Sequence, residues 1–142
     1  MDRKKLIKHL VFLMFFIFIA DIIAQKLHWY FSIWWFDMVM HFLGGFWVGL
    51  FFIWFFSIKD LPIFQLSLEK ADFKLIMKTI LFVLSFGILW EFFEIFTHNY
   101  IAHDPFNILD TTSDIFFDLA GGVSAILYYL KNIIPVGENK VQ

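Results

Sequence analysis

The chain has 142 residues, of which 61% are hydrophobic and 23% aromatic, and its formal net charge is −2. Its mean hydropathy of +0.75 lies far outside the range of soluble globular proteins and indicates an integral membrane protein. The absence of cysteine excludes disulfides and thiolate metal ligands, so any metal site must use oxygen and imidazole groups.

Four apolar stretches are each long enough to cross a bilayer as a helix of about 20 residues. They cover residues 6–25, 35–57, 73–97 and 112–131. The prolines fall between or after these stretches, where helix breakers are expected: Pro62, Pro105 and Pro135. We therefore predict an all-α polytopic membrane protein, a four-transmembrane-helix bundle that forms a single membrane domain over residues 1–142.

The basic residues predict the orientation of these helices. The first stretch follows MDRKK, but no small-x-small cleavage site follows it and three more spans come after it, so we interpret it as a retained helix rather than a signal peptide. With the N-terminus in the cytoplasm, ten of the eleven lysines and arginines lie on the cytoplasmic side, and only Lys26 lies outside. We expect a multi-pass cell-membrane protein with cytoplasmic N- and C-termini, a cytoplasmic loop at about 58–72 and a cytoplasmic tail at 132–142.

In this topology, three helix ends that carry acidic residues face outward together. The second stretch begins FDMVMHFLGG, the third ends WEFFEIFTH, and the fourth begins DTTSDIFFDLAGG. Intervals of four or seven residues place the polar side chains of each stretch on one helix face. The outward set comprises Asp37, His41, Glu91, Glu94, His98, Asp110, Asp114 and Asp118.

Glycines lie beneath each polar set: Gly44, Gly45, Gly87, Gly121 and Gly122. Because small residues let membrane helices approach closely, we expect these glycines to mark the faces that meet, with the acids inside the bundle. The segments DMVMHFLGG (37–45) and DIFFDLAGG (114–122) also share an acid, a polar ligand type four residues later and a Gly-Gly pair. Two duplicated helical hairpins would explain this likeness, and coincidence among few residue types is the open alternative.

The outward acids need compensating positive charge. A charged carboxylate well inside a membrane helix costs about 2.5 to 3.5 kcal/mol, and only Lys26 is basic on the outer side. Protons, water or a bound metal remain, and carboxylates with imidazoles on neighbouring helices form metal sites in bundles. We predict that a divalent ion (Zn²⁺, Mn²⁺, Fe²⁺ or Mg²⁺) is bound by Glu91, Glu94, His98, Asp110, Asp114 and Asp118. The predicted catalytic acid/base groups, or further ligands, are Asp37 and His41.

Structural roles are the alternative for several polar residues. Asp110 is a candidate helix cap, and TTSD fits a capping box from Thr111 to Asp114. Neither role explains Asp118. Asp21 is a candidate isolated polar residue bonded to a neighbouring helix. The outer-loop residues expected to be solvated are His28, His103 and Asp104.

The motif segments resemble those of a known family. FDMVMHFLGGFWVG, SFGILWEFFE and DTTSDIFFDLAGG look like the D-x-x-x-H-F, E-x-x-E and D-x-x-x-D-x-x-x-D-x-x-x-G elements of the bacterial YjdF-like family of uncharacterised inner-membrane proteins, over residues 36–125. They are more loosely similar to the VanZ-like group, but Glu94 replaces its glutamine, Asp118 replaces its asparagine, and its arginine before the last helix is missing. The YjdF-like resemblance implies a topology and no established reaction, whereas the VanZ-like one implies a link to glycopeptide resistance or the cell envelope.

Three functional classes stay open. The first is an intramembrane metal-dependent hydrolase that acts on a lipid or lipid-linked envelope substrate. The second is a proton or cation carrier component, for which four short helices are few. The third is a non-catalytic envelope or antibiotic-resistance protein of the VanZ-like type. The expected partners are the lipid bilayer and, for the first class, a lipid-linked substrate, with no nucleic acid.

Overall fold

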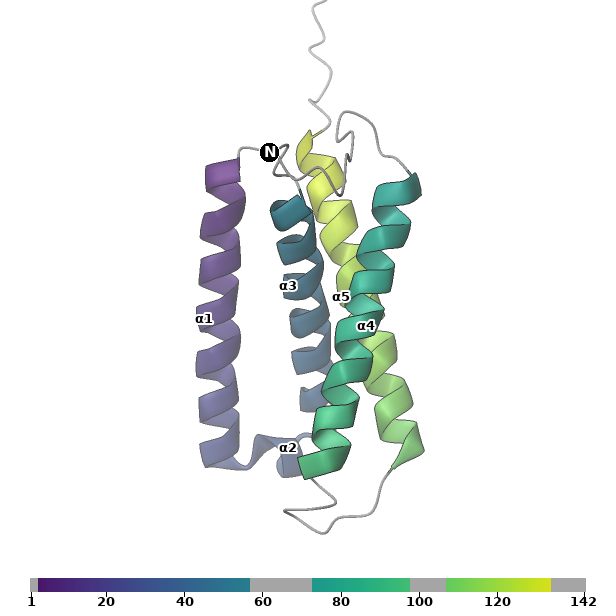
Figure 1. Ribbon diagram of the computed structural model, residues 1–142. Helices are drawn as coiled ribbons and strands as arrows, with labels where there is room; N and C mark the ends of the chain where they lie inside the picture. The colour runs from purple at the N-terminus through teal and green to yellow at the C-terminus, as the bar shows by residue number, and fades with distance from the viewer. Residues whose placement is uncertain (1–2, 57–72, 98–106, 134–142) are drawn as a thin grey trace, which may run out of the picture.

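The computed structural model describes residues 3–56, 73–97 and 107–133, and these residues are almost entirely helical (Figure 1). The helices are α1 (Arg3–Leu27), α2 (Trp29–Ser32), α3 (Phe36–Phe56), α4 (Phe73–Thr97) and α5 (Ile108–Ile133). The four long helices are each long and apolar enough to cross a membrane. The predicted all-α four-helix membrane bundle is thus confirmed, and the short helix α2 is an addition to it.

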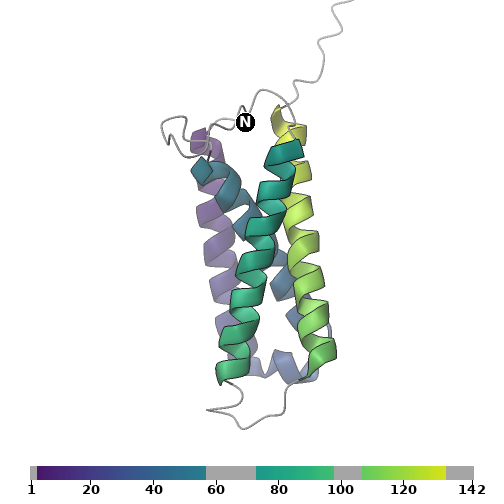
Figure 2. The same ribbon diagram turned by 45° about the vertical axis from the view of Figure 1, so that its right-hand side comes forward.

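Successive long helices run in opposite directions (Figure 1). The start of α3, the end of α4 and the start of α5 therefore lie at the same end of the bundle, as expected from the sequence. Helix α3 packs against each of the other three long helices, and most closely against α5. A view turned by 45° shows α4 and α5 side by side (Figure 2). Three separate segments thus meet at one end.

Glycine makes the close approach of α3 and α5 possible. A Cβ atom on Gly45 would overlap the backbone of Asp118, and one on Gly121 would overlap the backbone of Phe42. Small residues at such contacts let membrane helices pack backbone to backbone. The prediction that glycines mark the contacting faces is confirmed at these positions but wrong for Gly44, whose Cβ would meet nothing within 4 Å.

The opposite half of the bundle has an apolar core. Two clusters of buried side chains occupy it, one of Leu6, Leu10, Leu50 and Ala125 and the other of Ile53, Leu75, Ile126 and Tyr129. Helix α1 is joined to this half by two polar contacts. The indole Nε1 of Trp47 donates to the carbonyl oxygen of Leu10 at 2.9 Å, and the Tyr128 hydroxyl lies 3.1 Å from Nδ1 of His9.

The start of α5 differs most from the predicted helix bounds. Helix α5 begins at Ile108, four residues earlier than expected, because Oδ1 of Asn107 accepts a hydrogen bond from the backbone N–H of Leu109 at 3.2 Å. Asp110 and the proposed Thr111–Asp114 capping box consequently lie inside the helix.

Between α1 and α2, His28 adopts a left-handed conformation with a φ of 55°, which lets the chain turn sharply.

Candidate metal centre

The buried charged side chains gather at one end of the bundle. Among the described residues, the buried polar or charged side chains are His41, Thr79, Glu91, Asp114 and Asp118, and all but Thr79 lie where α3 begins, α4 ends and α5 begins. The Thr79 hydroxyl donates to the backbone of its own helix. Asp37 and Glu94 lie beside this group and are partly exposed. We call six residues the acidic cluster: Asp37, His41, Glu91, Glu94, Asp114 and Asp118.

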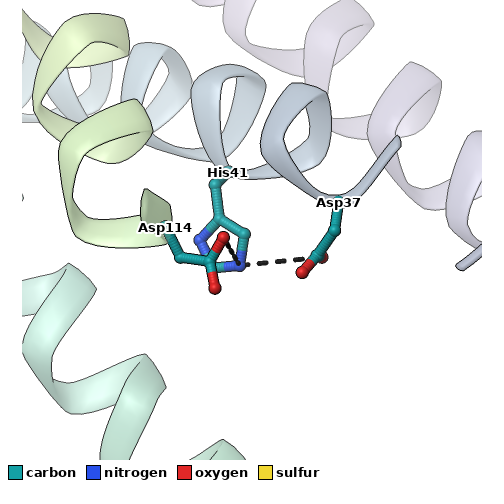
Figure 3. Close-up of side chains that lie close together, drawn as sticks. All are labelled: Asp37, His41 and Asp114. Atoms are coloured by element: carbon teal, nitrogen blue, oxygen red, sulfur yellow. Dashed lines mark ion pairs between the residues drawn. The ribbon is translucent and has the colours of Figure 1, made fainter. Parts of the chain in front are cut away.

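His41 lies at the centre of the acidic cluster and faces carboxylates from both of its ring nitrogens. Its Nε2 atom is 3.8 Å from Oδ1 of Asp37 and 4.0 Å from Oδ1 of Asp114 (Figure 3). Its Nδ1 atom is 3.5 Å from Oδ1 of Asp118. Because a neutral imidazole donates from one nitrogen only, the other turns a lone pair toward a carboxylate. A second proton or a metal ion would relieve that repulsion.

Glu91 brings a carboxylate of α4 into the cluster. The residue is 5% exposed, and its Oε1 atom has no hydrogen-bond partner among the described residues. A buried acceptor left without a partner costs about 1 to 3 kcal/mol, and more when it is charged. The oxygen therefore marks a position where a cation or a proton is expected.

Two groups of candidate metal ligands overlap at His41. In the first group, ligand atoms of Asp37, His41 and Asp114 all lie within 4.8 Å of one another. In the second group, the same holds for His41, Glu91 and Glu94. Oxygen and imidazole ligands bind Zn²⁺ or Mg²⁺ at about 2.0 to 2.2 Å, so atoms on opposite sides of one ion are about 4 Å apart. Small side-chain movements would therefore bring either group around an ion.

Missing side chains make room for Asp118 between the helices. A Cβ atom on Gly87 of α4 would lie 2.6 Å from Oδ2 of Asp118, and one on Gly45 of α3 would overlap the Asp118 backbone. Any larger residue at either position would displace this carboxylate or the helix that carries it. The glycines thus position Asp118 beside His41.

The structure brings six of the eight predicted site residues together in the acidic cluster. Asp110 is exposed in the first turn of α5 and belongs to neither ligand group. His98 lies outside the described residues, as do His103 and Asp104. His28 is exposed, as expected. The catalytic and metal-binding roles of the eight residues stay predictions.

Sequence reasoning missed Tyr30, which lies next to the acidic cluster. Its hydroxyl donates to Oδ1 of Asp21 at 2.8 Å, and Nε2 of Gln25 donates to Oδ2 of Asp21 at 2.8 Å. Burial, followed by this hydrogen bond, raises the pKa of Tyr30, and the charges of Asp37 and Glu94 act in the same direction. No sequence signal separates Tyr30 from the other aromatic residues around it, because the contact depends on the turn at residue 28.

Comparison with known proteins identifies one match. The chain matches a family model described as "Predicted membrane protein (DUF2238)" over residues 2–132. No curated protein and no solved structure matches it. The family description states a membrane location and no reaction, and it is compatible with the YjdF-like resemblance, whereas nothing in it supports the VanZ-like one.

Proposed function

Since the chain belongs to the DUF2238 family of predicted membrane proteins, we propose that it is a membrane metalloprotein whose acidic cluster binds a divalent ion and hydrolyses a lipid or lipid-linked substrate. One observation carries the metal proposal. Buried carboxylates from α4 and α5 converge on a single buried imidazole of α3, and the Glu91 Oε1 atom among them has no partner within the described residues. Such a convergence of acids in a membrane bundle is costly unless a cation is bound.

The charges of the surrounding chain support a cation from outside. Residues 27–58 and 79–130, which include every member of the acidic cluster, contain no lysine or arginine. The flanking Lys78 and Lys131 belong to the start of α4 and the end of α5, at the opposite end of the bundle (Figure 1). Within the described helices α3, α4 and α5, the five carboxylates of the cluster share one histidine, His41. A divalent ion offsets more of this excess of negative charge than protonation of His41 alone would.

The ligand chemistry narrows the choice of ion. Carboxylate oxygens dominate the cluster, and a single imidazole supplies nitrogen. Hard or borderline ions such as Mn²⁺, Mg²⁺, Fe²⁺ and Zn²⁺ accept such a set, and carboxylate oxygens favour Mn²⁺ and Mg²⁺ most. We therefore rank Mn²⁺ and Mg²⁺ first.

The position of the cluster favours hydrolysis at one membrane face over transport. The side chain of Asp37 is 31% exposed, so the cluster reaches the surface at its end of the bundle. Toward the other end, the described buried side chains carry no charge; they include the two apolar clusters and Thr79, whose hydroxyl bonds its own helix. A carrier needs polar groups that continue across the membrane. A one-sided site suits a substrate held in the lipid headgroup region.

The residues of the cluster have separable roles in this proposal. A bound divalent ion supplies Lewis-acid activation of water and of a phosphoryl or acyl group. Asp37 is the more exposed carboxylate beside His41 and offers one oxygen to the ion, and we assign its other oxygen the general-base role toward an attacking water. His41, whose Nε2 faces both Asp37 and Asp114, orients these carboxylates or joins the ligand set.

Metal analysis of the purified protein tests the proposal. We expect wild type to carry a divalent ion and Glu91→Gln to bind it at least about tenfold more weakly, because the amide keeps the shape and loses the charge. Asp21→Asn is the matched control, since Asp21 lies outside the cluster and an asparagine oxygen still accepts from Tyr30. Metal-free wild type, even after incubation with Mn²⁺ and Zn²⁺, would refute the proposal and favour a protonated cluster.

A further inference from the structure

The acidic cluster contains two ligand groups rather than one. The first joins α3 to α5 through Asp37, His41 and Asp114, and the second joins α3 to α4 through His41, Glu91 and Glu94. Only His41 is common to both groups, and because a neutral imidazole has one free lone pair, His41 would be a ligand of one of the two ions. We propose that the cluster holds two divalent ions, one at the Asp37–Asp114 side and one at the Glu91–Glu94 side; this inference rests on the proposed metal function and adds its stoichiometry.

The unpartnered oxygen of Glu91 points to the second ion. An ion bound by Asp37 and Asp114 would account for the carboxylates that face Nε2 of His41. It would leave Oε1 of Glu91 buried and without a partner among the described residues. Glu91 is 95% removed from solvent, so bulk water does not replace that partner. A second cation beside Glu91 and Glu94 supplies it.

The charge of the cluster gives independent support. Its five carboxylates come from helices that bring no lysine or arginine to this end. One divalent ion offsets two of the five negative charges, whereas two ions offset four. One negative charge then remains, and the Nδ1 atom of His41 faces Asp118 at 3.5 Å. Two ions therefore leave one negative charge of the five uncompensated, whereas one ion leaves three.

The arrangement also fits the way in which bundles hold metal pairs. Paired ions in helix bundles are bound by carboxylates that project inward from facing helices, together with few imidazoles. Here Glu91 and Glu94 lie three residues apart on α4, opposite Asp37 of α3 and Asp114 of α5. Carboxylate-rich pairs of this kind take Mn²⁺, Fe²⁺ or Mg²⁺, and Mn²⁺ is the useful probe because its spin is directly detected.

Counting Mn²⁺ ions on the full-length protein tests the inference. The protein in detergent is stripped with a chelator, titrated with Mn²⁺ and desalted, and the bound metal is measured together with the electron paramagnetic resonance spectrum. We expect about two ions per chain in wild type, with the spin-coupled signal of a close pair. Asp37→Asn and Glu94→Gln should each retain about one ion with an uncoupled signal. Asp21→Asn should keep both ions and the coupling.

The outcomes separate the two proposals. A single uncoupled ion in wild type, lost to the same degree in both variants, would overturn the two-ion inference and leave the metal function standing. Complete absence of bound Mn²⁺ from wild type would refute the metal function itself. Because the coupled signal is read on wild type, the test does not depend on the variants folding.

Discussion

At the scale of single residues, the surroundings of His41 and Glu91 are the main evidence for a cation site. His41 is 7% exposed and turns both ring nitrogens toward aspartates, an arrangement that a second proton on the ring or a bound metal ion would stabilise. Glu91 leaves a buried oxygen without a partner among the described residues. Two ordinary structural roles, a satisfied core histidine and a neutral hydrogen-bonded glutamic acid, fit these environments poorly. The residues are therefore better explained as parts of a cation site.

Tyr30 yields a pH-dependent prediction. We expect Tyr30→Phe to lower the free energy of unfolding by about 1 kcal/mol at neutral pH, because it removes the hydrogen bond to Asp21. The pKa of Tyr30 is raised in the folded protein, so this stabilisation is fully present below the ordinary tyrosine pKa and is lost as pH rises above it. Thermal unfolding of both proteins in detergent between about pH 7 and 11 measures the difference. A difference that stays constant up to the highest pH would contradict the raised pKa.

At the scale of elements, the crossing of α3 and α5 positions the site. Gly45 and Gly121 face the backbone of the other helix, and this contact brings the His41 turn of α3 beside the Asp114 and Asp118 turns of α5. Helix α4 packs against this pair at Gly87, where the absence of a side chain leaves space for the Asp118 carboxylate. The position of the acidic cluster thus depends on helix contacts made at glycines.

The two adjacent glycines of α3 provide a matched pair of substitutions. Gly45→Ala should destabilise the protein by about 2 to 3 kcal/mol and weaken metal binding, because its Cβ would overlap the Asp118 backbone and force the helices apart. Gly44→Ala should be neutral or stabilising by up to about 1 kcal/mol, since its Cβ meets nothing and alanine favours the helix. Thermal unfolding with metal titration compares them. Equal effects of the two substitutions would show that the crossing does not set the site.

At the scale of the whole molecule, the alternating helix directions gather three acidic helix ends at one face. The distribution of basic residues predicts that this face is the outer one, because among the described basic residues only Lys26 lies at the end that holds the cluster, whereas the others, such as Lys78 and Lys131, lie at the opposite end. That sidedness decides which substrates the site can meet. Only an outward site suits an envelope substrate.

Single-cysteine labelling tests the orientation, helped by the absence of native cysteine. Lys26 in the last turn of α1 and Lys131 in the last turn of α5 are both exposed. These two helix ends lie at opposite ends of the bundle (Figure 1). In intact bacterial cells, a membrane-impermeant maleimide should label Lys26→Cys and should label Lys131→Cys only after the membrane is permeabilised. The cysteine-free wild type gives the background. The reverse pattern would place the acidic cluster in the cytoplasm and exclude an outer-leaflet substrate.

The sequence alone determined the four apolar helices, their alternating directions and the end at which the acids collect, because length, hydropathy and periodicity act along the chain. It could not determine where α5 begins, because Asn107 rather than Asp110 caps that helix. Nor could it separate Gly45 from Gly44, or the buried Asp114 from the exposed Asp110, since such differences depend on how each helix is rotated against its neighbours. Only the tertiary structure decided that His41 is the residue shared by both ligand groups, because contacts between three helices have no counterpart in local spacing.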